Sequence, residues 1–549
     1  MEYKVKIFDS TLRDGAQAGG VSFSVGDKLK ILKVLDKLGI SYIEAGNPGS
    51  NSKDLQFFKE ARKIKLENSK LVAFGSTRRK NISVIEDDNL KSLLEAETSV
   101  IAIFGKSWDL HVTDIIQTEL DENLAMIRDT IAFLKDYRKE IIFDAEHFFD
   151  GYKNNREYAL KTLQAAVDGG ADWLVLCDTN GGAFPHEVFE ITKYVVENYP
   201  VKVGIHCHND CAMAVANSMM AVDAGAAQIQ GTYIGFGERC GNANLSTIIP
   251  NLQLKKQISC IPEEQLKNLT ATARYIGEIT NIALDEWAPY IGKNAFAHKG
   301  GMHIDGVYKL PRSFEHVSPE SVGNSRRFLM SEVSGKNTVL TKIQKIDGAI
   351  TKYSAQTQQI TDELKALEHM GYQFEGAEAS FELVIRKQLG KYNPSFEVNY
   401  FKVIEEEPTR EEGFSSSVLI KVRVDGREEM TAAEGNGPVN ALDRALRKAL
   451  EMFYPSLREV HLTDYKVRVL DAEKATGAKV RVLIESSDGQ KSWSTVGVST
   501  NIIKASLIAL VDSIEYKLIS DKEENDNRRD INNGDDYDSE NISCPCRVG

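Results

Sequence analysis

Eight short apolar segments, each followed by an amphipathic helical pattern, organise the first half of this chain. The segments are Val5–Phe8, Tyr42–Ala45, Leu71–Phe74, Val100–Phe104, Ile141–Ala145, Trp173–Cys177, Val201–His206 and Gln228–Tyr233. Helical patterns such as Val25–Leu38 and Arg156–Gly169 lie between them, and a glycine follows each of these two where a helix should end. Eight alternations over about 250 residues are typical of a (β/α)8 barrel. A doubly wound open sheet is the alternative, but no Gly-x-Gly-x-x-Gly fingerprint follows the first segment.

Composition limits the partners that this chain can have. Its 549 residues are enough for about three or four domains. A net charge of −13 argues against nucleic acid and anionic membranes as partners. The N-terminus lacks a signal-peptide pattern, and no stretch of about 18 apolar residues predicts a transmembrane helix. The seven cysteines lack zinc-site or disulfide spacing, so we expect free thiols and a cytoplasmic protein.

Polar residues follow the predicted strands, at the end of a barrel where catalytic groups gather. The stretch Asp9-Ser-Thr-Leu-Arg-Asp-Gly-Ala-Gln17 comes after the first strand. Within it, Arg13 has a planar guanidinium whose N–H donors match a carboxylate, and Asp14 offers hard oxygen ligands to a divalent cation. Taken alone, this pair is equally consistent with an ordinary ion pair in a loop.

Two histidines at the end of the seventh strand strengthen the prediction of a metal site. His206 and His208 are two residues apart, so both side chains point to the same face of the strand. Closure of the barrel brings Asp14, on strand one, near both histidines. Asn242 follows strand eight, which lies between strands one and seven, so it is near enough to add an oxygen. One carboxylate and two imidazoles with open positions suit a catalytic divalent metal such as Mg, Mn, Co or Zn.

Other strand ends supply candidate catalytic and substrate-binding residues. Glu146 is either an acid or base or a carboxylate that orients a histidine. Thr179 either binds a substrate carboxylate or caps the next helix. Asp144 shares the side of strand five on which Glu146 lies, and we expect it to face the substrate. Glu44 is expected beside the substrate, more as support than as a reacting group.

The remainder of the chain divides by composition. We predict a catalytic barrel over 1–270, helical linker and lid subdomains over 271–391, an α+β domain over 392–518 and a disordered acidic tail over 519–549. The linker contains a glycine-flanked polar segment, 294–306, which is either an active-site lid or a plain loop. The 392–518 domain follows a β-β-α-β-β-β-α order. It is either a ligand-binding or dimerisation module or a structural appendage.

Three motifs together resemble one enzyme family. Asp9-Ser-Thr-Leu-Arg-Asp-Gly-Ala-Gln17, Gly204-Ile-His-Cys-His-Asn-Asp210 and Gly237-Glu-Arg-Cys-Gly-Asn-Ala-Asn244 resemble signatures of the 2-isopropylmalate, homocitrate and citramalate synthases. The resemblance runs from residue 1 to about 518, and the combination is highly specific. The segments Gly437-Pro-Val-Asn-Ala-Leu442 and Val496-Gly-Val-Ser499 resemble the family's regulatory and dimerisation domain.

The resemblance implies a reaction and a set of roles. Members of the family condense acetyl-CoA with a 2-keto acid and then hydrolyse the thioester. Asp14, His206, His208 and Asn242 match the metal positions, Arg13 matches the group beside the keto oxygen, and Thr179 matches the residue that holds the carboxylate. His303 matches a histidine that the family supplies across a homodimer to act as base, and Glu146 matches the barrel glutamate that works with it.

Several stretches, among them Phe104-Gly-Lys-Ser-Trp-Asp109 and Phe143-Asp-Ala-Glu-His147, look most like the citramalate synthase branch. That branch implies pyruvate as keto acid and isoleucine as feedback inhibitor; 2-isopropylmalate synthase is the alternative. Two alternative functions lie outside this enzyme class: a retro-aldol or retro-Claisen lyase, and an amino-acid-sensing barrel that has lost catalytic activity. One position departs from the family: Phe314 stands where relatives carry a tyrosine, so that Tyr308 or another group must supply any hydroxyl needed for hydrolysis.

Overall fold

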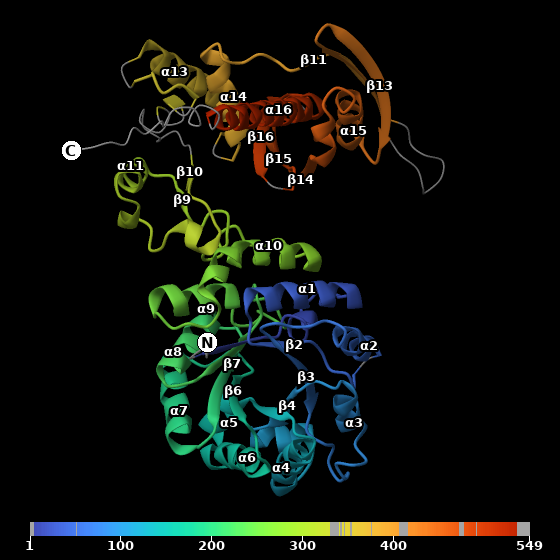
Figure 1. The fold of residues 1–549 in the computed structure, drawn as a ribbon, viewed down its shortest axis with the longest axis vertical. Coiled ribbons are helices and arrows are strands. Elements are labelled where there is room, and N and C mark those ends of the chain that lie inside the picture. Colours follow the sequence, from blue (N-terminus) through green and yellow to red (C-terminus); the bar gives the residue numbers. More distant parts are fainter. Residues whose placement is uncertain are drawn as a thin grey trace, which may run out of the picture. The chain divides into compact units, whose positions relative to one another are not determined.

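A computed structural model describes residues 5–50, 52–329, 340, 343–344, 346–351, 354–374, 376–405, 416–470, 477–489 and 491–534 (Figure 1). The chain divides into two compact units. The first comprises residues 1–297 and 311–327, and the second comprises 298–310 and 328–549. Within the described ranges, no helix is long and apolar enough to cross a membrane.

The first unit contains a closed barrel of eight parallel strands in sequence order, which confirms the predicted fold. The strands are β1 (Lys6–Asp9), β2 (Tyr42–Glu44), β3 (Lys70–Ser76), β4 (Val100–Lys106), β5 (Glu140–Glu146), β6 (Trp173–Asp178), β7 (Lys202–Cys207) and β8 (Gln228–Gly231). Closure occurs where β1 pairs with β8, from Lys6 opposite Gln228 to Asp9 opposite Gly231. This pairing places the loops after strands one, seven and eight side by side.

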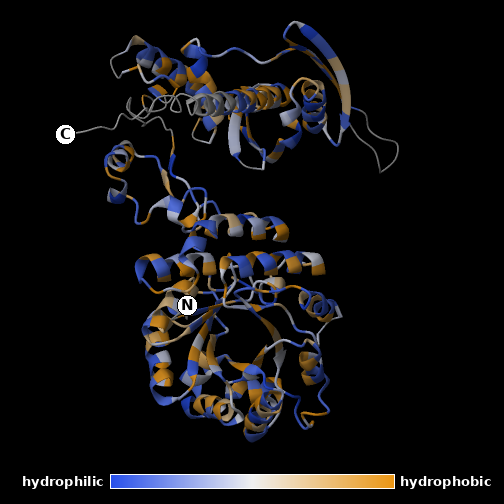
Figure 2. Cartoon of the chain, viewed as in Figure 1, coloured by the Kyte–Doolittle hydropathy of each residue, from blue (hydrophilic) through white to orange (hydrophobic). Residues whose placement is uncertain are grey.

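Helices surround the barrel and bury one face each against the strands. They are α1 (Val25–Leu38), α2 (Ser52–Ala61), α3 (Asp88–Glu95), α4 (Leu120–Asp136), α5 (Phe148–Asn154), α6 (Arg156–Gly169), α7 (Pro185–Asn198), α8 (Ala214–Asp223) and α9 (Leu245–Pro250). Helix α1 begins with a capping box between Ser24 and Asp27 and ends at Gly39, whose φ is 94°. Figure 2 shows the strands largely in the hydrophobic colour and the helices in both colours, as amphipathic packing requires.

The first unit extends beyond the predicted domain boundary at residue 270. That boundary falls inside α10 (Leu269–Thr280), whose buried residues include Leu269, Ala273 and Ile276. Tyr233, next to β8, donates a hydrogen bond from its hydroxyl to the Leu269 oxygen (3.1 Å). Thr270 donates to the Val322 oxygen (2.7 Å). These contacts hold α10 and part of the predicted linker in the barrel unit.

The second unit contains two successive β-β-β-α motifs. The first consists of β11 (Glu397–Glu405), β12 (Ser416–Val424), β13 (Arg427–Gly435) and α15 (Pro438–Leu450). The second consists of β14 (His461–Val469), β15 (Val480–Ser487), β16 (Ser492–Ser499) and α16 (Ile502–Gly534). Strand β13 was not anticipated from the sequence. It pairs with β12 along its whole length, from Ser416 opposite Gly435 to Val424 opposite Arg427.

Helices from the predicted linker also belong to the second unit. They are α11 (Gly301–Lys309), α13 (Ala355–His369) and α14 (Glu378–Gln388). Phe374 and Phe381 share a core cluster with Val496 of β16, so the 354–391 region is built onto the α+β domain. Two short strands, β9 (Ala297–His298) and β10 (Arg327–Phe328), lie where the chain passes between the units.

Helix α16 continues past the predicted start of the disordered tail. It continues to Gly534, so residues 519–534 of the predicted tail are helical in this structure, while 535–549 lie outside the described residues. Two ion pairs lie on its first added turn. Arg386 of α14 pairs with Glu523 (2.8 Å), and Lys517 pairs with Asp521 one turn further along α16 (2.7 Å).

Candidate active site

A polar cavity of about 320 Å³ opens at the carboxyl ends of the barrel strands. Seven of the predicted site residues line it, namely Arg13, Asp14, Asp144, Glu146, Thr179, His206 and His208. The other lining residues, which were not predicted from the sequence to belong to this site, are Gln17, Asn47, Phe74, Phe104, Cys177 and Glu238. Four strands, β1, β5, β6 and β7, therefore contribute predicted groups to one space, at the end of the barrel where catalytic groups gather.

Asp14, His206 and His208 form the group of described side chains that is suited to hold a metal ion. One ligand atom from each lies within 4.8 Å of the others, and all three residues are buried. Asp14 Oδ2 lies 3.5 Å from His206 Nε2 and 4.0 Å from His208 Nε2. The two Nε2 atoms are 3.3 Å apart. Facing imidazole nitrogens beside a carboxylate are a donor set for a divalent cation.

Asn242 completes this group from the loop after β8. Its amide nitrogen lies 3.4 Å from His206 Nε2, and its Oδ1 is buried without a hydrogen-bond partner. Asp14 Oδ1 is likewise buried and unpartnered. Two orphaned oxygens beside two imidazoles are costly unless a cation compensates them. The residues therefore fit the predicted divalent metal.

Electrostatics prepare these ligands for binding. Burial lowers the pKa of His206, and burial together with His206 lowers that of His208 to about 4, so both imidazoles are neutral near pH 7. Burial raises the pKa of Asp14, but Arg13 and the two histidines outweigh it and keep the carboxyl ionised. Metal ligands must be deprotonated, which is the state that this environment favours.

Gln230, on β8, orients one of the histidines. Its Oε1 lies 3.0 Å from His206 Nδ1, and its amide nitrogen donates to Asp144 Oδ1 (3.0 Å). An Oε1 acceptor fixes the proton of His206 on Nδ1 and leaves the Nε2 lone pair for a metal. The sequence analysis missed this residue, although a glutamine inside an apolar strand segment is a recognisable signal.

Arg13 is held rigidly at the cavity wall. Its Nε donates to Glu44 Oε2 (2.6 Å), and its NH1 donates to Asp14 Oδ2 (3.1 Å). The guanidinium carbon lies 3.8 Å from the centroid of the Phe74 ring. Both carboxylates favour the charged guanidinium, so its pKa stays above the ordinary value despite burial.

Glu44 lies behind Arg13 and not on the cavity wall. Its side chain is fully buried, and its Oε2 also accepts a hydrogen bond from the Ser10 hydroxyl (2.5 Å). The geometry therefore corresponds to the supporting part of the prediction for Glu44: it holds the guanidinium and does not reach the substrate space.

Asp144 is a buried acid that faces the cavity. Burial and the neighbouring Glu44 raise its pKa to about 8. Near pH 7 this carboxyl is therefore largely protonated, so it presents one hydroxyl donor and retains acceptor capacity. A protonated side chain adds no negative charge to the cavity.

Glu146 and Thr179 also line the cavity. Glu146 Oε2 forms an ion pair with Lys106 Nζ. The Thr179 hydroxyl accepts a hydrogen bond from the His147 backbone N–H (2.8 Å), which leaves its own proton to donate. Helix α7 has Phe184 at its N-cap, so Thr179 does not cap the next helix.

His303 lies on α11 in the second unit and its side chain is exposed. Its predicted role as a base stays a prediction. The predicted lid segment 294–306 forms the beginning of α11 and the residues before it.

Family models match this chain in three consecutive blocks. One described as HMGL-like matches residues 4–276, one described as Homocitrate synthase post-HMGL domain-like matches 290–371, and one described as LeuA allosteric (dimerisation) domain matches 375–518. With the closed barrel, these matches define the class: an acyltransferase-type barrel enzyme with a C-terminal regulatory dimerisation domain.

Whole-chain relatives narrow this class. An (R)-citramalate synthase from Aquifex aeolicus is 54% identical, covering 95% of this chain and 99% of the relative. One from Geobacter sulfurreducens is 51% identical, covering 94% and 98%. A 2-isopropylmalate synthase from Pyrococcus furiosus is only 29% identical over 94% of this chain and 99% of its own length. The chain belongs to the (R)-citramalate synthase family.

Proposed function

We propose that this enzyme condenses acetyl-CoA with pyruvate and hydrolyses the product to (R)-citramalate and free CoA. The methyl group of acetyl-CoA loses a proton, its carbon bonds to the keto carbon of pyruvate, and water then cleaves the thioester. The observation that carries the proposal is the convergence of Arg13, Asp14, His206 and His208 on one cavity. The identity to (R)-citramalate synthases over nearly the whole chain supports the choice of pyruvate.

Asp14, His206, His208 and Asn242 would hold the divalent metal, whether Mg, Mn, Co or Zn. When bound, such an ion polarises the keto carbonyl and makes its carbon electrophilic. The buried, unpartnered oxygens of Asp14 and Asn242 support this assignment.

Arg13 and Thr179 bind the keto acid from two sides. The guanidinium is fixed by Glu44 and Asp14, so it is already in place to stabilise the alkoxide that develops as the carbon–carbon bond forms. The Thr179 hydroxyl uses its lone pair for His147 and donates its proton to the pyruvate carboxylate. Asp144, neutral near pH 7, adds a small polar wall that leaves room for a methyl group.

In a homodimer, His303 supplied by one subunit would remove the proton of acetyl-CoA with the help of Glu146 of the other. A base with a carboxylate partner is the usual arrangement for abstracting a proton next to a carbonyl. Phe314 has no hydroxyl, so the water that cleaves the thioester must be activated elsewhere, and Tyr308, an exposed residue of α11, is our candidate.

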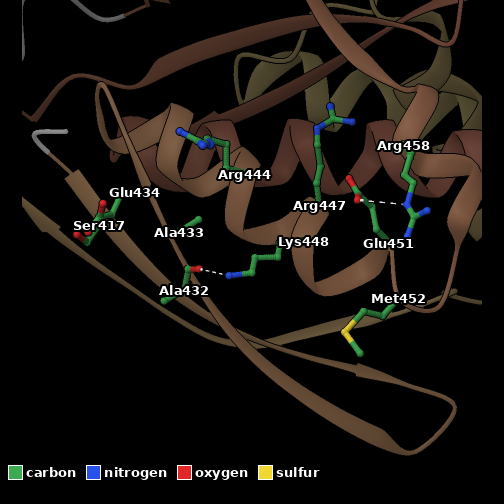
Figure 3. Close-up of a pocket in the computed structure, with 10 residues that line it drawn as sticks. All are labelled: Ser417, Ala432, Ala433, Glu434, Arg444, Arg447, Lys448, Glu451, Met452 and Arg458. Carbon is green, nitrogen blue, oxygen red and sulfur yellow. Dashed lines mark hydrogen bonds and ion pairs between the residues drawn. The ribbon is translucent and has the colours of Figure 1, made fainter. Parts of the chain in front are cut away.

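We propose further that the α+β domain mediates a homodimer and binds isoleucine. Its match to a LeuA allosteric (dimerisation) domain supports both roles. A cavity of about 720 Å³ lies between β12, β13 and α15 (Figure 3). It presents Lys448 and Arg444 beside Glu434 and Glu451, with Met452 as an apolar wall. Opposite charges beside an apolar wall suit a zwitterion with an aliphatic side chain.

Release of free CoA tests the proposed reaction. The purified chain is given acetyl-CoA, a divalent metal and, in parallel, pyruvate, 2-oxoisovalerate or 2-oxoglutarate. We expect thiol release that depends on pyruvate. A preference for 2-oxoisovalerate would identify the enzyme as a 2-isopropylmalate synthase instead. If no CoA were released with any of the three keto acids, the proposal would be overturned.

A further inference from the structure

Lys106 occupies a place in the active site that the roles described above do not explain. It is the last residue of β4, and its register partner on β5 is Glu146. Its Nζ forms an ion pair with Glu146 Oε2, and the two side chains are only 18% and 24% exposed. The ion pair thus sits directly on the proposed partner of the catalytic base.

Hydrogen bonds hold the backbone of both residues of this ion pair in place. The Lys106 carbonyl oxygen accepts a hydrogen bond from the Asn123 side chain on α4 (2.9 Å). The Ser107 backbone N–H donates to the Glu146 carbonyl oxygen (3.1 Å), which continues the β4–β5 ladder by one step. Because both residues stand at the ends of paired strands, their backbones hold the two side chains within reach of each other.

The ammonium also lies near two residues that line the cavity, Phe104 and Glu146. Its Nζ lies 5.6 Å from the centroid of the Phe104 ring. Phe104 stacks on Phe74 (centroids 5.3 Å apart), which in turn carries the Arg13 guanidinium. Lys106 and Arg13 therefore flank one pair of aromatic rings, with Glu146 held on the Lys106 side.

We propose that Lys106 is a positioning residue for Glu146 in the condensation, an inference that rests on the proposed function. A carboxylate without a fixed partner rotates and is solvated in several orientations. Pairing one of its oxygens with Lys106 holds the group in one orientation and leaves acceptor capacity for the base or the substrate. Lys106 acts through Glu146 and not on the substrate itself.

The competing explanation is that the ion pair only stabilises the barrel mouth. Partly exposed ion pairs contribute on the order of 0–1 kcal/mol to stability. That explanation predicts that replacing Lys106 lowers stability slightly. It also predicts that any effect of the replacement on kcat is the same with and without Glu146. A double-mutant cycle separates the two accounts, because coupled residues give non-additive effects.

The experiment measures kcat for CoA release from acetyl-CoA and pyruvate in four full-length proteins: wild type, Lys106→Met, Glu146→Gln and the double variant. We expect Lys106→Met to lower kcat at least about tenfold with an unchanged melting curve. In the Glu146→Gln background, the same change should alter kcat less than about twofold. Lys106→Arg, which keeps the charge, should recover most of the activity.

A matched control uses another ion pair of the barrel. Lys135 on α4 pairs with Asp172 at 2.8 Å, and Lys135→Met should leave kcat unchanged. If Lys106→Met does not fold, Lys106→Gln takes its place in the cycle. A wild-type rate in the folded single variant, or losses that simply multiply, would overturn the role of Lys106 alone. If the wild-type protein released no CoA, both the proposed function and this role of Lys106 would be overturned.

Discussion

At the scale of single residues, the site is a balance between burial and charge. Asp14 stays ionised inside the barrel because Arg13 and two histidines surround it, whereas burial and Glu44 raise the pKa of Asp144 to about 8. The sequence predicted which of these residues meet, because strand spacing and barrel closure determine it. It did not predict Lys106 or Gln230. Their roles depend on side-chain contacts between neighbouring strands, which no local pattern encodes.

The metal ligands give the first prediction. Asp14→Asn removes the charged ligand of the proposed set of four, and His206→Ala removes an imidazole, so we expect each variant to lower kcat at least about a thousandfold. Metal content per chain, measured by elemental analysis, should fall in parallel, while circular dichroism stays unchanged. Normal turnover in either folded variant would refute the assignment.

Asp9, a fully buried acid on β1, gives a prediction about pH. Burial raises its pKa from 3.8 to about 7, and its Oδ2 has no hydrogen-bond partner. The folded protein therefore holds this proton over a pH range in which the unfolded chain releases it, and stability falls as the pH rises from about 4 to 7. The full effect is on the order of 4 kcal/mol.

The variant Asp9→Asn cannot ionise, and it keeps an acceptor for the Thr11 N–H, which donates to Asp9 Oδ1 in the wild type (2.9 Å). We expect the urea midpoint of the variant, relative to wild type, to rise between about pH 4 and 7 and to level off above that range. Parallel pH curves for the two proteins would show that Asp9 is not the buried acid responsible.

At the scale of elements, the eight barrel strands were predictable because each is a buried apolar run bounded by polar residues. Strand β13 was not, because Arg427, Glu428, Glu429 and Glu434 make it as polar as a loop. Its strand conformation comes from pairing with β12 and packing against α15. Helix α16 likewise continues past residue 519, where Arg386 of α14 pairs with Glu523, a contact that composition alone does not reveal.

The loop after β8 gives a prediction at this scale. A Cβ added at Gly237 would lie 1.9 Å from Asn242 Oδ1 and 3.5 Å from Asp14 Oδ1. Gly237→Ala should therefore displace Asn242 and weaken metal binding about 10- to 100-fold, the range typical of changes around a metal site. Titration with metal ion, followed by recovery of CoA release, measures this.

Gly182→Ala is the matched control, because a Cβ there meets no atom within 4 Å and the residue also lies in a loop at the barrel mouth. It should bind metal as the wild type does. Equal metal affinity in the Gly237 and Gly182 variants would remove Asn242 from the ligand set.

At the scale of the whole molecule, the chain joins a barrel unit to an α+β unit, and the predicted linker is divided between them. Sequence periodicity found the domains but not this division, because the helical patterns after residue 270 do not say which core they cover. The contacts of Thr270 with Val322, and of Phe381 with the α14–β16 core, decide it.

Regulation is predicted at the scale of the whole chain. If isoleucine binds the α+β domain, Lys448→Met should raise the isoleucine concentration that halves the activity at least tenfold, without changing the uninhibited rate. Lys448 donates to the Ala432 oxygen at the cavity between β13 and α15 (3.2 Å). Lys421→Met, which removes a partner of Glu428 on the same sheet, is the control.

Inhibition should also disappear in a chain that ends at residue 391, provided that it still releases CoA. Inhibition that is unchanged in this truncated chain would end the regulatory hypothesis.

Identification of the product tests the central claim most directly. The full-length protein is incubated with acetyl-CoA, pyruvate and a divalent metal, and the organic acids are separated on a chiral column. The account predicts (R)-citramalate in amounts equal to the CoA released, and none from the Asp14→Asn variant. CoA release without citramalate, or citramalate from that variant, would contradict it.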